Sequence, residues 1–151
     1  MSVPSNVKVY SADEVSITLA GIPIDSGFAD GDFVSIEPAS DDFTDKIGAE
    51  GEVARAKTND HRATIKIKLM QTSSGHALLS VLRQVDINNP NGAGVGAFLV
   101  RDRGGSLVAH AEHAWIQKPP SPGLGREVGE WEWTLRAADM DLQFPGSPAL
   151  P

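Results

Sequence analysis

Alternation between apolar and polar residues, with a period of two, dominates this chain. Residues 14–20 and 63–70 show it most clearly, because every second side chain there is Val, Ile or Leu. Such a pattern is typical of strands that bury one face. We therefore expect six strands, at residues 14–20, 32–37, 63–70, 97–101, 106–117 and 129–137.

One segment has helical periodicity instead. Its apolar residues fall on a single helical stripe, Ser73 or Ser74 can cap its start, and the Asn-Asn-Pro-Asn-Gly run at residues 88–92 ends it. The stripe that we expect to face inward is Ala77, Leu78, Leu82 and Val85. The prediction is one helix that covers a face or an end of a sheet.

Turns and irregular stretches separate these elements. Asp-Arg-Gly-Gly at residues 102–105 predicts a hairpin turn, because glycine accepts positive φ without steric cost. Residues 38–59 are acidic and contain glycines, and we interpret them as a long loop of the kind that is usually functional or mobile. Residues 118–125 are a proline-rich connection. Residues 144–151 read as an extended C-terminal arm, because their prolines can continue neither a central strand nor a helix.

Length and composition narrow the class of protein. The 151 residues and 16.0 kDa suit a single domain, which we expect to span residues 1–151. The chain has no cysteine, which excludes disulfides, thiolate zinc sites and iron–sulfur clusters. Its net charge of −7 argues against wrapping DNA or anionic lipid with the whole surface. We expect no secretory signal and no membrane insertion, hence a soluble protein made in a cytoplasm.

Motifs for catalysis or metal binding are weak. His110 and His113 flank a carboxylate, but residues three apart on a strand point to opposite faces, so we do not expect them to share a metal ion. Gly92, Gly94 and Gly96 follow a helix and precede a strand, the reverse of the order in a dinucleotide loop. The acidic cluster at residues 41–45 lacks the ligand spacing of a calcium loop. No Gly-x-Ser-x-Gly elbow is present, so we expect no enzyme and no cofactor.

Two tryptophans leave one alternative open. Trp131 and Trp133 lie on one face of the expected strand at residues 129–137, where they could form a platform for a sugar. Leu135 continues the same face, so we favour a place in the core or in a subunit contact.

The order of the pieces carries more information than any motif. Ala-Thr-Ile-Lys-Ile-Lys-Leu-Met-Gln-Thr-Ser-Ser-Gly-His-Ala-Leu-Leu at residues 63–79, Ala-Trp-Ile-Gln-Lys-Pro-Pro at 114–120 and Glu-Trp-Glu-Trp-Thr-Leu at 130–135 together resemble the tail tube proteins of contractile-tailed bacteriophages. The resemblance runs from about Val15 to Leu142. It extends to the tube proteins of type VI secretion systems.

The resemblance implies a mainly β fold, a small barrel or sandwich with one flanking helix and long assembly loops. It implies a structural subunit that forms stacked hexameric rings, through which DNA is delivered without specific binding. Sheath, baseplate and tail terminator proteins would be its partners, and the virion tail its location after assembly in the host cytoplasm. Exposed strand edges suit such an assembly, because neighbouring copies can pair them.

Within that picture, residues 38–59 are the candidate contact segment between subunits or rings. The residues that we expect to make the contacts are Asp42, Phe43, Asp45, Ile47, Glu50 and Val53. An isolated subunit should leave the segment mobile, because it holds too few apolar side chains to offset the entropy of ordering. The alternative function is a small β-sandwich that binds a ligand or carbohydrate through Trp131 or Trp133; a phage hydrolase is more distant.

Overall fold

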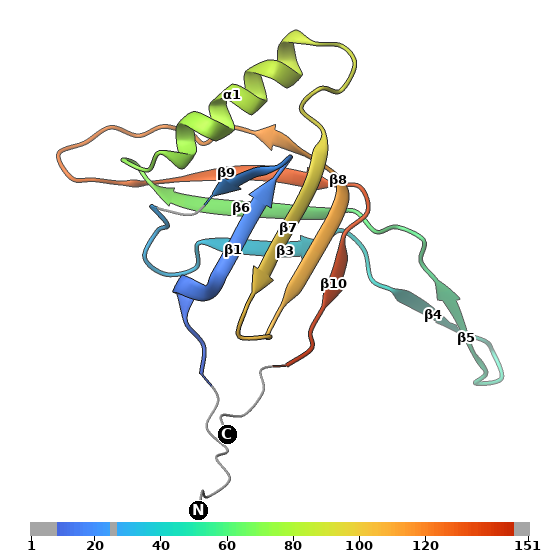
Figure 1. The fold of residues 1–151 in the computed structure, drawn as a ribbon. Coiled ribbons are helices and arrows are strands. Elements are labelled where there is room, and N and C mark those ends of the chain that lie inside the picture. The colour runs from blue at the N-terminus through green and yellow to red at the C-terminus, as the bar shows by residue number, and fades with distance from the viewer. Residues whose placement is uncertain (1–8, 25–26, 147–151) are drawn as a thin grey trace, which may run out of the picture.

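The computed structural model describes residues 9–24 and 27–146 (Figure 1). A short 3-10 helix, η1 (Ala12–Glu14), leads into the strands. Within these ranges the strands are β1 (Val15–Leu19), β2 (Ile22–Ile24), β3 (Val34–Pro38), β4 (Phe43–Ile47), β5 (Val53–Lys57), β6 (Ala63–Met70), β7 (Gly96–Asp102), β8 (Val108–Lys118), β9 (Glu130–Ala137) and β10 (Asp141–Gln143). The helix α1 (Gly75–Asn88) lies between β6 and β7.

Eight of the strands form one antiparallel sheet in the order β2-β1-β7-β8-β9-β6-β3, with β10 paired to β8. In Figure 1 the strands β1, β7 and β8 run across β9, β6 and β3, so the sheet folds over on itself. The long strand β8 connects the two halves, because its first part pairs with β7 and its last part with β9. The predicted mainly β fold with one helix is confirmed, whereas a closed barrel is not formed, since the sheet ends at β2 and β3.

The core lies between the two halves of the folded sheet. Period-two alternation supplies it: in β6 the residues Ala63, Ile65, Ile67 and Leu69 are buried while their neighbours are more exposed. Phe98 and Leu135, from the two halves, are both fully buried. The expected strands at residues 14–20, 32–37, 63–70, 97–101, 106–117 and 129–137 all exist, with ends shifted by a few residues.

The helix closes one end of the sandwich, and its buried face includes Leu82 of the stripe that we expected but not Ala77, Leu78 or Val85. Leu79 and Leu82 are buried, whereas Leu78 is 41% and Val85 37% exposed. Gly75 lies close to the sheet, since an added Cβ there would lie 3.0 Å from Leu69 Cδ1. The buried residues of the helix are Gly75, Leu79 and Leu82, and the helix ends at Asn88 as predicted.

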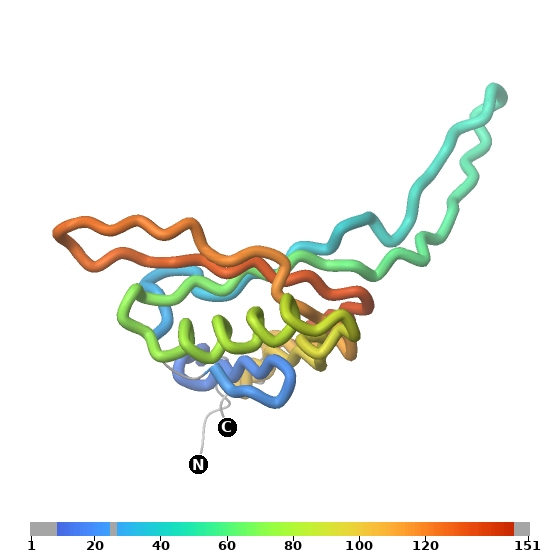
Figure 2. Tube along the Cα trace, turned by 90° about the horizontal axis from the view of Figure 1, so that it is seen from above, coloured from blue at the N-terminus to red at the C-terminus, as the bar shows by residue number. Residues whose placement is uncertain are grey.

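Residues 38–59 are not the irregular loop that we expected. They contain β4 and β5, which form a separate two-stranded sheet (Figures 1 and 2). The sequence does not predict these two strands, because Asp45 and Arg55 share a face with Phe43, Ile47 and Val53 and interrupt the apolar pattern. The C-terminal arm expected at 144–151 is described only as far as Gly146, and the rest lies outside the described residues.

Candidate functional site

The β4–β5 hairpin, residues 41–58, projects from the body of the molecule (Figure 2). A type of three-residue turn common in hairpins closes its tip: Gly48 N donates to Glu52 O at 2.7 Å, and Gly51 has φ +86°. Every residue of both strands is exposed. A two-stranded sheet with no further support is marginally stable in water. The hairpin is therefore a candidate surface for contact with another molecule.

The two faces of the hairpin differ. Strand register places Phe43, Asp45 and Ile47 of β4 opposite Lys57, Arg55 and Val53 of β5 on one face. There the Arg55 guanidinium lies 4.3 Å from the centre of the Phe43 ring, and Ile47 and Val53 are 69% and 65% exposed. The other face carries Thr44, Lys46, Ala54 and Ala56.

Four of the six predicted contact residues thus share one face. Phe43, Asp45, Ile47 and Val53 lie along it, Asp42 lies at the base of the hairpin and Glu50 in its turn. Sequence reasoning missed Arg55, which packs on Phe43 and lies directly opposite Asp45. A hairpin turn predicted at residues 48–51 would have fixed the strand register and placed Arg55 opposite Asp45.

A carboxylate fixes the root of the hairpin where it leaves the sheet. Asp60 accepts hydrogen bonds from Ser40 Oγ at 2.8 Å, from Arg62 N at 3.1 Å and from Arg62 Nε and Nη2 at 2.8 Å each. The Arg62 guanidinium, followed by the Ser40 hydroxyl, holds the pKa of Asp60 well below its usual range. Asp60 therefore stays ionised and ties residue 40, before the hairpin, to residue 62, after it.

A second projection leaves the opposite side of the body. It is the β8–β9 loop, residues 119–129, in which residues 121–128 are all exposed (Figure 2). Leu124 is 80% and Val128 61% exposed. Its base is held by Gln71, whose side chain accepts from Gly129 N at 3.1 Å while its backbone N donates to Gly129 O at 2.9 Å.

The tryptophans are not a ligand platform of the expected kind. Trp133 is only 3% exposed, and its Nε1 donates to His76 Nδ1 at 2.9 Å. His76 Nε2 lies 2.9 Å from Met70 O, so one tautomer, with the proton on Nε2, satisfies both contacts. Trp131 is half-buried and meets His76 at 5.2 Å between ring centres. Our interpretation of Trp133 as a core residue is confirmed.

A β-bulge changes the expectation for the histidines of β8. The register with β7 shifts between Gly96 and Phe98, opposite residues 111–114, so Ala111 and Ala114 are both buried although they are three apart. The rule that we applied to His110 and His113 therefore fails at this point. The bulge brings Glu112 and His113 beside Asp139, with ligand atoms within 4.8 Å of one another.

These three residues are the set within the described ranges that could hold a metal ion. His113 Nδ1 already lies 2.9 Å from Asp139 Oδ2, and His113 N donates to Asp139 Oδ1 at 3.0 Å. The hydrogen bond to Asp139 raises the pKa of His113. The contact ties β8 to the corner before β10.

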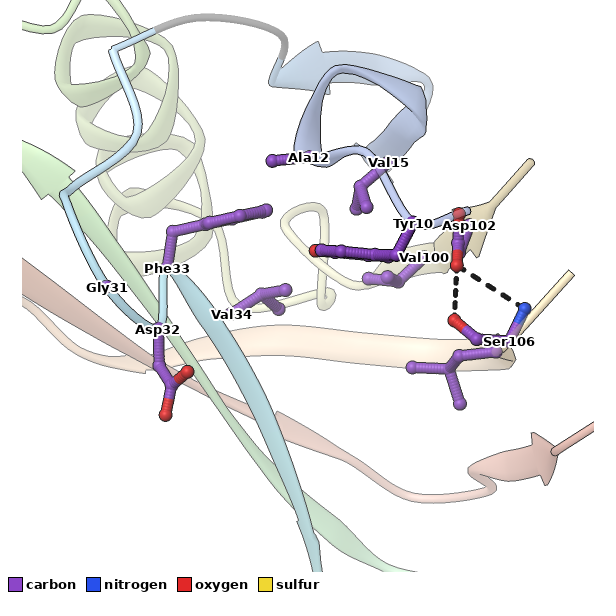
Figure 3. Close-up of a pocket in the computed structure, with 11 residues that line it drawn as sticks. Tyr10, Ala12, Val15, Gly31, Asp32, Phe33, Val34, Val100, Asp102 and Ser106 are labelled. Atoms are coloured by element: carbon purple, nitrogen blue, oxygen red, sulfur yellow. Dashed lines mark hydrogen bonds between the residues drawn. The ribbon is translucent and has the colours of Figure 1, made fainter. Parts of the chain in front are cut away.

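A cavity of about 350 Å³ opens beside the β7–β8 turn, where Tyr10, Phe33 and Asp102 meet (Figure 3). Asp102 is buried, but it accepts hydrogen bonds from Gly104 N at 2.8 Å and from the Ser106 hydroxyl, which lowers its pKa. Asp32 points away from the cavity (Figure 3). The carboxylate thus caps the predicted 102–105 turn.

Among the described residues, no helix is long and apolar enough to cross a membrane.

Comparison with solved structures identifies the class of this fold. The chain is similar to a chain of the sheath/tube terminator of an extracellular contractile injection system, PVC, in the extended state, with a TM-score of 0.59, 12% identity and coverage of 92% and 99% of the two chains. It is also similar to a chain of the PVC sheath-tube complex (TM-score 0.57, 11% identity, 90% and 92% covered). The tube-terminating cap of the anti-feeding prophage gives 0.58 at 10% identity, with 95% and 96% covered. The fold is that of tubes and terminators of contractile injection systems.

The sequence makes the assignment specific. Residues 7–144 match the family described as bacteriophage PhiTE tail tube protein, and the chain belongs to that family. A relative described as structural protein ORF10 of Pseudomonas phage KPP10 is 25% identical over 138 residues, which cover 91% of this chain and 76% of the relative. The protein is a structural subunit of a phage tail tube and a part of the virion tail.

Proposed function

We propose that this chain assembles into stacked hexameric rings that form the inner tube of a contractile tail. The observation that carries the proposal is the β4–β5 hairpin, which is exposed on both faces and holds three large apolar side chains on one of them. In the tube that face lies against a neighbouring subunit or the next ring. The contact residues are Asp42, Phe43, Asp45, Ile47, Glu50 and Val53.

Other proteins of the tail complete the proposal. Two of the similar structures are described as a sheath-tube complex and a sheath/tube terminator, and on that basis the partners of this tube are its sheath and terminator, with a baseplate at the other end. The helix α1 has an exposed, uncharged stripe that includes Leu78, Val81 and Val85. This stripe is the candidate contact surface for the sheath. Subunits accumulate in the host cytoplasm before assembly, and DNA passes through the lumen without specific binding.

Removal of the hairpin tests the central claim. Deletion of residues 42–57 should leave a folded body with near wild-type melting, because the hairpin forms a sheet of its own. The variant should fail to stack at any concentration in analytical ultracentrifugation and negative-stain microscopy. Tubes formed by the deletion variant would refute the contact role.

A single-residue pair sharpens this test. Ile47→Asp places a charge on the apolar face, and Lys46→Asp places one on the opposite face of the same strand. We expect the Ile47 variant to lose stacking and the Lys46 variant to keep it. Equal behaviour of the two variants would mean that the face with Ile47 is not the one that binds.

Amide hydrogen exchange gives an independent measurement. Residues 40–58 should exchange rapidly in isolated subunits, because neither face of the hairpin is covered, and slowly in assembled tubes. Rapid exchange in both states would leave the hairpin as a surface feature without a role in assembly.

A further inference from the structure

The β4–β5 hairpin and the β8–β9 loop leave the body at opposite ends of one strand ladder. β6 and β9 pair from Ala63 opposite Ala137 to Met70 opposite Glu130. The hairpin precedes Ala63 and the loop precedes Glu130, so the two projections are separated by the length of the eight-pair ladder, about 24 Å at 3.4 Å per residue step. Figure 2 shows them extending to opposite sides of the molecule.

Both projections present apolar side chains to solvent. Ile47 and Val53 near the hairpin tip are 69% and 65% exposed, and Leu124 and Val128 of the loop are 80% and 61% exposed. Neither projection can cover the other within one molecule, because the ladder holds them apart. Two molecules displaced along the strand direction bring the hairpin of one to the loop of the other.

The charges of the two projections and the stiffness of the loop backbone also favour a contact between the hairpin and the loop. Residues 41–58 carry five carboxylates and three basic side chains, whereas the loop carries one of each, Arg126 and Glu127, and Lys118 at the end of β8 adds a positive charge beside it. Pro119, Pro120 and Pro122 restrict the loop backbone, so that less conformational entropy is lost when it binds. Such a contact joins two different surfaces and is therefore heterologous, as a repeating assembly requires.

We propose that the β8–β9 loop of a second copy of this chain is the docking site of the β4–β5 hairpin, with Leu124 and Val128 packing on Ile47 and Val53. The inference rests on the proposed tube function and adds the receiving surface. It also gives the β8–β9 loop a role in assembly, as the surface that receives the hairpin.

Engineered cysteines test this contact directly, because the chain has none of its own. The double variant Ile47→Cys with Leu124→Cys should give a ladder of disulfide-linked dimers, trimers and higher species when assembled tubes are oxidised, since each chain both donates and receives. Disulfides require Cα atoms within about 7 Å, so only docked pairs react. The ladder should be absent in dilute subunits below the assembly concentration.

A matched control uses the helix. Val81 of α1 is 62% exposed, as accessible as Val128, and Ile47→Cys with Val81→Cys should give about tenfold less cross-linked product, because the thiols lack the millimolar effective concentration of a docked pair. Val53→Cys with Val128→Cys provides a second reporter if the first pair disturbs folding.

The outcomes separate the two proposals. Tubes that persist without residues 42–57 refute the contact role of the hairpin itself. Tubes that need the hairpin, but in which neither loop pair cross-links above the Val81 control, overturn the docking site alone. A ladder with either loop pair supports it.

Discussion

Trp133 is a large core side chain whose removal should destabilise the body of the protein strongly. It is 3% exposed, packs in the core cluster and has its indole nitrogen bonded to His76. Trp133→Ala should lower the free energy of unfolding by about 3–5 kcal/mol, measured by urea denaturation. That is a large share of the 5–15 kcal/mol or so that a domain commonly has.

Trp133→Phe is the matched control, because it keeps an aromatic ring in the core while it removes part of the ring volume and the hydrogen bond to His76 Nδ1. It should cost clearly less than the alanine variant. A folded Trp133→Ala protein with wild-type melting would show that the ring is not part of the core.

The contact between His113 and Asp139 makes stability depend on pH. The hydrogen bond to Asp139 raises the pKa of His113 above its ordinary value of 6.5, so the folded state binds the proton more tightly than the unfolded state. The stabilisation is complete below about pH 6.5 and is lost as the pH rises through the folded pKa.

Melting temperatures of wild type and His113→Gln between pH 5 and 9 measure this effect. We expect the difference between them to shrink toward the alkaline end. Since both side chains are partly exposed to solvent, the change should also diminish at high salt. A difference that grows with pH would contradict the assignment.

At the scale of elements, the β1–β2 turn and the start of β7 fit closely. Ala20 and Gly21 form a two-residue turn with φ +51° and +80°. An added Cβ at Gly96 would lie 2.6 Å from Ala20 Cβ and 2.8 Å from Ala20 Cα. Gly96→Ala should therefore destabilise the protein by about 1–3 kcal/mol, as overpacking commonly does.

Gly123→Ala in the β8–β9 loop is the control for this substitution. A Cβ there meets nothing within 4 Å, so thermal melting should not change. If both variants melt alike, the close approach of Ala20 to Gly96 does not limit the fold.

The elements differ in how well the sequence predicts them, and the reason is burial. Residues 63–70 alternate without a break because β6 is paired on both sides, with β9 and β3, and has one face in the core. The predicted bounds of this strand therefore agree with the observed ones, Ala63–Met70. β4 and β5 bury neither face, so nothing imposes a regular apolar pattern on them. The α1 sequence offers more than one apolar stripe, and the close packing of Gly75 beside Leu69 in the buried one is a tertiary contact that periodicity does not contain. The bulge at residues 111–114 is likewise a feature of strand pairing.

At the scale of the whole molecule, the excess of seven negative charges leads to a prediction about the lumen. A channel for DNA should repel the phosphate backbone, so carboxylates should outnumber Lys and Arg on the inner wall. The outer face of β6 and β9 alone does not decide this, because Lys68 lies directly opposite Glu132. A cryo-EM structure of the assembled tube measures the charge of the wall, and a net basic lumen would refute the prediction.

The placement of the hairpin and the β8–β9 loop at opposite ends of the β6–β9 ladder gives the molecule a direction. A filament built by head-to-tail contacts inherits that polarity, with free hairpins at one extremity and free loops at the other. The protein that initiates growth and the protein that stops it then face chemically different surfaces. One chain can therefore encode, through the placement of two projections, which end of the tube is started and which end is capped.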